Sequence, residues 1–70
     1  MDLFLAEIGK EYTIKEVLSG DAEVDSFLFS LGCYSGEPIT VINRTKSACI
    51  VVVKDARYSI DKELSRCIKI

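Results

Sequence analysis

Cysteine is the residue type in this chain with the clearest capacity for metal or redox chemistry, because its 70 residues include no histidine. The thiols are Cys33, Cys49 and Cys67, and their spacing matches no CxxC metal or redox motif. Three thiolates that converged in space could bind a soft or borderline metal ion. Unpaired cysteines otherwise pack as small hydrophobic residues in a reducing compartment. We therefore expect reduced, mostly buried thiols and no metal site.

The residues needed for catalysis are missing. Without histidine the chain lacks the commonest general base, and no nucleophile–base pair stands out. Gly32 and Gly36 do not have the spacing of a phosphate-binding loop, and no Lys-Ser or Lys-Thr pair follows them. The acids Asp21, Glu23 and Asp25 suit a solvated helix start better than a chelate. We predict that the protein is not an enzyme and binds no cofactor.

Partner binding is the chemistry that the aromatic residues could perform. Phe29 lies roughly 100° away from the apolar stripe of a predicted helix. It is either covered by the N-terminal Leu3 and Phe4 or exposed to a partner. Tyr34 is amphipathic, so it either covers one end of the domain or joins an interface. The basic residue Arg57 is the third candidate contact.

Charge is distributed unevenly. Residues 1–37 carry eight acids and two bases, whereas residues 38–70 carry seven bases and three acids. The two sets either form two distinct faces or intermix on one small surface. The net charge of −2 gives no general attraction to nucleic acid or to anionic lipid. A small basic groove for nucleic acid remains an alternative, built from Arg44, Lys46, Lys54, Arg57 and Tyr58.

A chain of this length forms a single domain, residues 1–70, with one thin core. Its composition, 49% hydrophobic with one proline, argues against disorder. The longest apolar run, residues 48–53, is far shorter than the roughly 20 residues that span a bilayer. No basic and apolar leader opens the sequence. We therefore expect a cytoplasmic protein.

Five strands and one helix would position these side chains. Strands are predicted, from period-two patterns and turn residues, over residues 10–18, 38–42, 48–54, 57–60 and 67–70. Asp21 is placed to cap a helix whose apolar stripe is Val24, Phe27, Leu28 and Leu31, and Gly32 to end it. Asp55-Ala56 reads as a tight turn, and Asp61 as the cap of a single helical turn over residues 62–66. Periodicity alone predicts a small, mostly β, partly open barrel without choosing among SH3-like, OB-like and ubiquitin-like types.

The order of residues resembles the ferrous iron transport protein A (FeoA) family over nearly the whole chain. Residues 28–36, LFSLGCYSG, followed by Ile39 and Val41, resemble its helix–LG–xxx–G–x–x–I–x–V core. Leu3, Gly9 and Ile14 resemble its opening strand motif, and residues 58–61 and 68–70 its closing segment. The resemblance implies a mostly β, SH3-like five-stranded barrel with one short helix inserted after the first strand.

The same resemblance implies a non-enzymatic accessory protein of bacterial ferrous iron uptake. Such a protein would dock on the cytoplasmic G-protein region of a membrane-embedded iron transporter and modulate it. It would reach the membrane only through that partner and would bind no nucleic acid. Besides the nucleic-acid-binding barrel, an SH3-like domain of a metal-dependent regulator is an alternative. The sequence does not fix the oligomeric state.

Overall fold

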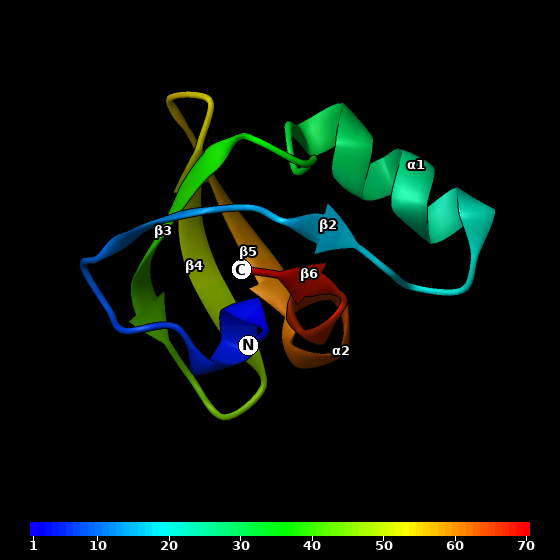
Figure 1. Cartoon of the computed structure of the whole chain (residues 1–70). Coiled ribbons are helices and arrows are strands. Elements are labelled where there is room, and N and C mark those ends of the chain that lie inside the picture. Colours follow the sequence, from blue (N-terminus) through cyan, green and yellow to red (C-terminus); the bar gives the residue numbers. More distant parts are fainter.

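Two antiparallel sheets form the framework of the computed structural model, which describes residues 1–70 (Figure 1). The larger sheet has the order β1-β3-β4-β5, with bounds β1 Glu11–Thr13, β3 Pro38–Arg44, β4 Ala48–Val53 and β5 Ala56–Asp61. The smaller sheet pairs β2 (Glu16–Val17) with β6 (Ile68–Lys69). The helices are the 3₁₀ turn η1 (Leu3–Leu5), α1 (Ala22–Leu31) and α2 (Lys62–Arg66). The prediction of a mostly β fold is confirmed.

The single strand predicted over residues 10–18 is wrong, because the structure divides it into β1 and β2. The backbone N–H of Ile14 donates to Glu37 O at 2.9 Å, while that of Lys15 donates to Lys69 O at 2.7 Å. The backbone therefore changes its hydrogen-bonding partner from the segment that begins β3 to strand β6 between two successive residues, Ile14 and Lys15. Ile14 itself is buried. Leu18, expected to continue the alternation, is exposed. The fold has six strands instead of five, and α1 follows the second.

The core lies between the two sheets. Helices η1 and α2 cover the end of the core that is near the two chain termini (Figure 1). In β4 every second residue is buried, so Cys49, Val51 and Val53 share one inner face. Two residues from η1 and its end, Leu3 and Ala6, are fully buried beside them. The other buried hydrophobic residues are Ile14, Leu28, Cys33, Ile39, Val41, Ile60, Ile68 and Ile70.

Helix α1 begins and ends where the sequence predicts. The Asp21 carboxylate accepts from the Glu23 N–H at 2.9 Å, which caps the first turn. Gly32 adopts a left-handed conformation with φ of 100° and ends the helix. The predicted apolar stripe is only partly correct. Leu28 is fully buried and Leu31 half-buried, but Phe27 is 51% exposed, because α1 meets the sheets along a narrow line.

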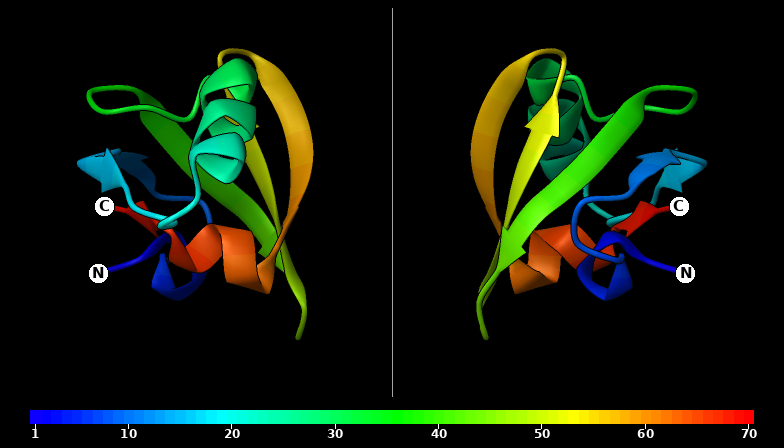
Figure 2. Two further views of the ribbon diagram at one scale, coloured as in Figure 1. Left: turned by 90° about the vertical axis from the view of Figure 1, so that its right-hand side faces the viewer. Right: turned by 90° about the vertical axis from the view of Figure 1, so that its left-hand side faces the viewer.

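The two α-helices lie at opposite ends of the molecule, as both views in Figure 2 show. Helix α2 is capped as predicted, since the Asp61 carboxylate accepts from the Leu64 N–H at 2.8 Å. It packs beside η1, close to both termini of the chain (Figure 1). No helix combines the length and the apolar character needed to cross a membrane.

Candidate partner-binding site

The structure brings Phe29 and Tyr34 together at the C-terminal end of α1. Their ring centroids are 4.8 Å apart, with 35° between the planes. The Phe29 side chain is 62% exposed. Leu3 does not cover it, because Leu3 belongs to the core, and Phe4 lies in a different groove beside α2. Of the two alternatives for Phe29, the exposed one therefore holds.

Two shallow grooves flank this aromatic pair, which we name the aromatic ridge. The first has a volume of about 450 Å³, and its walls include Leu31, Lys54 and Tyr58. The second, of about 270 Å³, includes Val17, Asp25 and Cys33. Phe29 and Tyr34 line both grooves, so the ridge forms the wall between them. Exposed aromatic rings between concave, partly apolar surfaces are typical of protein interfaces.

Lys54 fixes the position of Tyr34. Its Nζ lies 3.1 Å from Glu37 Oε1 and 5.0 Å from the centre of the Tyr34 ring. Hydrogen bonds to Tyr34 and to Glu37 raise the pKa of Lys54 above its ordinary value. The Lys54 stem passes over Gly32, where an added Cβ would lie 2.6 Å from Lys54 Cγ. One side chain thus connects the β4–β5 turn, the end of α1 and the loop that follows it.

The turn that presents Lys54 differs by one residue from the prediction. The positive φ angles fall on Lys54 (53°) and Asp55 (61°), so this pair forms the turn instead of Asp55-Ala56. Two successive left-handed residues are typical of the two-residue turn that joins twisted antiparallel strands. Because neither residue is glycine, the position of the turn is hard to read from the sequence.

Arg57 lies apart from the aromatic ridge. In the β4–β5 register, Tyr58 pairs with Val51, whose side chain is in the core, whereas Arg57 pairs with Val52. Paired residues share one face of a sheet and successive residues alternate between faces. Tyr58 therefore points to the inner side and reaches the first groove, while Arg57 occupies the outer side of β5. Because β5 is an edge strand, the side chains of Tyr58 and Arg57 lie on opposite faces of the sheet but beside the same open edge.

Sequence reasoning overlooked Lys54 and Tyr58 as members of this site. Tyr58 was considered only as part of a basic groove, although its period-two relation to the buried Ile60 indicates the inner face of the sheet. The contact of Lys54 with Gly32 carries no sequence signal, because the two residues meet only through the tertiary fold.

All three thiols are free. Cys33 and Cys49 are buried as expected, while Cys67 is half-buried and its Sγ contacts Glu63 O at 3.3 Å. Burial raises the pKa of Cys33 to about 11. No group of three or more cysteine, aspartate or glutamate side chains is placed to hold a metal ion, so the thiols do not converge.

The remaining charged candidates have structural roles or are dispersed. Asp21 caps α1, and Asp25 accepts from Ser19 Oγ at 2.6 Å. Arg44 donates from Nη1 to Ala6 O at 2.6 Å, whereas Lys54 lies at the opposite end of the β3–β4 hairpin. Those two ends are separated by roughly 17 Å, at about 3.3 Å per strand residue. The five residues considered for nucleic acid therefore do not line one groove.

Comparison with known proteins places the fold and the family. The family model described as FeoA domain matches residues 1–70. A crystal structure of an iron uptake regulatory protein, FeoA, has a TM-score of 0.88 and 23% identity over 97% of this chain and 91% of that chain. FeoA of Stenotrophomonas maltophilia in complex with zinc, described as a prokaryotic SH3 domain protein and a candidate ferrous iron transport activating factor, has a TM-score of 0.85 and 16% identity over 97% of this chain and 86% of that chain.

A third solved structure is a manganese-dependent transcriptional repressor. Its TM-score is 0.88 at 16% identity, over 97% of this chain and 39% of the repressor. No curated protein matches the chain. At these identities the three structures establish the fold alone.

Proposed function

The chain belongs to the FeoA domain family, and we propose that it is a non-enzymatic accessory protein of bacterial ferrous iron uptake. It acts in the cytoplasm by docking on the G-protein region of a membrane-embedded iron transporter. The observation that carries this proposal is the aromatic ridge, an exposed Phe29 stacked near Tyr34 between two grooves. Family membership supplies the iron-transport context, and the ridge supplies the means of contact.

The ridge has the features of an energetic centre in an interface. Aromatic anchors that fill pockets provide most of the binding free energy of protein complexes. The Phe29 and Tyr34 rings already contact each other, and Lys54 lies over Tyr34, so part of the cost of ordering these side chains is met before a partner arrives. The charged pair of Lys54 and Glu37 stands at the margin of the rings, where a polar rim is expected.

Arg57 belongs to this interface as a rim residue. A partner that covers Tyr58 and continues around the edge of β5 would reach the Arg57 guanidinium on the outer side. Rim charges mainly alter association rates and salt dependence. Removal of the Arg57 charge should therefore slow association without abolishing binding.

The mechanism is modulation of the partner by binding. A docked protein shifts its partner only if it binds two conformations of that partner with different affinity. The G-protein region has nucleotide-bound and nucleotide-free conformations available for such discrimination. The chain contributes contact surface and no reacting group, in keeping with the lack of histidine and of a nucleophile–base pair.

Titration calorimetry with the cytoplasmic region of the transporter tests the proposal. Phe29→Ala combined with Tyr34→Ala should weaken binding by about tenfold or more, the loss typical of a central anchor. Phe27→Ala is the matched control, since Phe27 is an exposed phenylalanine on the same helix and lines neither groove. Binding that is absent in the parent protein, or equal in all three proteins, would overturn the proposal.

A further inference from the structure

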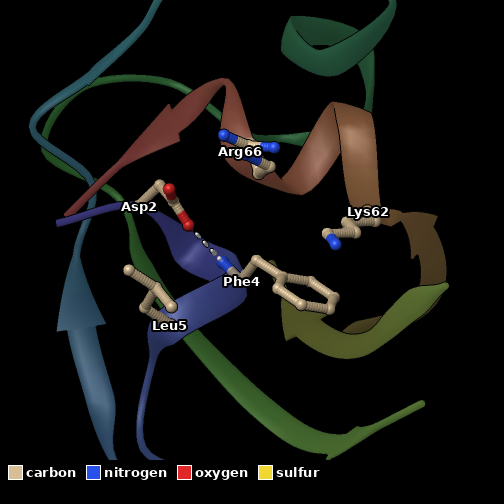
Figure 3. A pocket seen from close by; sticks show the side chains of 5 residues that line it. All are labelled: Asp2, Phe4, Leu5, Lys62 and Arg66. Carbon is tan, nitrogen blue, oxygen red and sulfur yellow. Dashed lines mark hydrogen bonds between the residues drawn. The ribbon is translucent and has the colours of Figure 1, made fainter. Parts of the chain in front are cut away.

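A third concave surface lies beside η1 and α2, away from the aromatic ridge and its two grooves. We name it the η1–α2 pocket; it has a volume of about 280 Å³ and is lined by Asp2, Phe4, Leu5, Lys62 and Arg66 (Figure 3). Phe4 forms part of its floor, and Leu5 is 65% exposed. None of these residues belongs to the aromatic ridge or its grooves.

Positive charge surrounds the apolar floor of this pocket. Lys62 Nζ lies 5.3 Å from the centre of the Phe4 ring, and Arg44 Cζ lies 5.8 Å from it. Lys62 and Arg66 are four residues apart on α2, so both side chains point to the same side of the helix. Lys69 adds a fourth cation nearby, since its Nζ donates to Arg66 O at 2.9 Å.

These cations have no acidic partner within the chain. The chain forms one ion pair, between Lys54 and Glu37, at the other end of the molecule. The only acid that lines the pocket is Asp2, and its carboxylate accepts from the Phe4 N–H at 3.0 Å (Figure 3). Lys62 and Arg66 thus outnumber the one acid that lines the pocket, and Arg44 and Lys69 add further positive charge beside it.

We propose that the η1–α2 pocket binds an acidic segment of a protein partner. An apolar side chain of that segment packs on Phe4 and Leu5, and flanking carboxylates bind Lys62 and Arg66. Charge complementarity selects the carboxylates, because guanidinium and ammonium groups beside an apolar surface form strong hydrogen bonds to anionic oxygens. This inference goes beyond the proposed docking of the aromatic ridge and does not depend on it.

Other ligands fit the pocket less well. Its volume is slightly below the roughly 300–1,000 Å³ typical of small-molecule sites, and it suits side chains of a peptide. Single-stranded nucleic acid binds by stacking successive bases on several aromatic side chains, whereas Phe4 is the only aromatic residue that lines this pocket. A membrane surface would favour a protruding basic face, whereas this one is concave.

The test is a titration of the ¹⁵N-labelled chain with a capped pentapeptide, acetyl-Glu-Glu-Leu-Glu-Glu-amide, followed by amide chemical shifts. We expect saturable shifts at residues 2–6 and 62–66 that weaken as salt concentration rises. The same peptide with glutamine in place of glutamate should cause no saturable shift. Equal shifts with both peptides, or none with either, would overturn the proposal.

Charge variants identify the residues responsible. Lys62→Gln combined with Arg66→Gln should weaken binding of the acidic peptide by about tenfold or more. Lys10→Gln combined with Lys15→Gln removes two positive charges outside the pocket and outside the grooves of the aromatic ridge, and should leave the affinity within about twofold. Thermal melts of both double variants establish that they are folded. Equal losses in the two variants would show unspecific attraction and overturn the proposal.

Sedimentation with vesicles that contain phosphatidylserine tests the alternative that the pocket binds lipid. We expect the chain to remain in the unbound fraction when such vesicles are sedimented at physiological salt. Sedimentation that depends on Lys62 and Arg66, together with no response to the acidic peptide, would make this a lipid-binding face and contradict the proposal.

Discussion

The contact between Lys54 and Gly32 determines the shape of the aromatic ridge. Gly32 is needed twice over, because it has a φ of 100° and because the Lys54 stem occupies the space where a Cβ would be. With Lys54 held there, its ammonium group reaches both Glu37 and the face of Tyr34. At the residue scale, therefore, a helix-ending glycine also positions an interface residue.

Replacement of Gly32 separates these two requirements. Gly36 has a similar φ of 92° but open space around it, so Gly36→Ala reports backbone strain alone, about 1–2 kcal/mol. Gly32→Ala should lower the free energy of unfolding further in urea titrations, because Lys54 must also move. In a Lys54→Ala background this excess should shrink. Equal losses for the two glycine variants would contradict the proposed packing.

The Cys33 thiol makes stability depend on alkaline pH. Its pKa is raised by burial from 9.0 to about 11, so between these values the unfolded chain releases a proton that the folded chain retains. The contribution is therefore complete below about pH 9 and is lost as pH rises toward about 11. Between about pH 8 and about pH 10, Cys33→Ala should lose less unfolding free energy than the parent protein, because it lacks the thiol that the folded chain keeps protonated. Parallel pH profiles for Cys33→Ala and the parent would rule this out.

At the scale of elements, α1 depends on a single fully buried side chain. Leu28 is 0% exposed, whereas its helical neighbours Phe27 and Phe29 are both exposed. Val24 and Leu31 are only partly buried. A helix held along such a narrow line leaves its remaining faces free, which explains why one short helix can both close the core and carry the ridge.

Leu28→Ala should cost about 2–5 kcal/mol of unfolding free energy, the range for a leucine removed from a packed site. Phe27→Ala, one residue away and half-exposed, should change stability by no more than about 0.5 kcal/mol. Chemical denaturation of the two variants measures the contrast. A loss of less than about 1 kcal/mol for Leu28→Ala would contradict the assigned packing of α1.

Local signals in the sequence predicted the elements that depend on neighbouring residues. Asp21, Gly32 and Asp61 have short-range hydrogen-bonding or dihedral roles, and all three act at the expected helix ends. The division between β1 and β2 was not predictable in this way. It results from two partners distant in the sequence, Glu37 and Lys69, that bind the successive residues Ile14 and Lys15.

Prediction of the candidate site was limited in the same way, by contacts between residues that are distant in the sequence. The angular position of Phe29 on the helix indicated its distance from the core stripe, and its proximity to Tyr34 followed from the short loop between them. Arg57 was grouped with them by charge alone, yet strand pairing places it on the outer side of β5. Sheet register, which depends on long-range pairing, decided which candidates share a surface.

At the scale of the whole molecule, the two ends differ in chemistry. The end with α1 presents the aromatic ridge, and the end with η1 and α2 presents a basic, partly apolar pocket. The uneven charge along the sequence therefore becomes, in part, a difference between two ends. A small protein with two such surfaces is suited to bind two partner segments at once.

The central claim is that the transporter's cytoplasmic G-protein region binds the aromatic ridge. The most direct measurement is the amide chemical shifts of the ¹⁵N-labelled chain during titration with that unlabelled region. The account predicts the largest changes at Phe29, Tyr34 and Tyr58, and their loss in Phe29→Ala but not in Phe27→Ala. Binding that leaves those three amides unshifted, or shifts that appear only in η1 and α2, would contradict it.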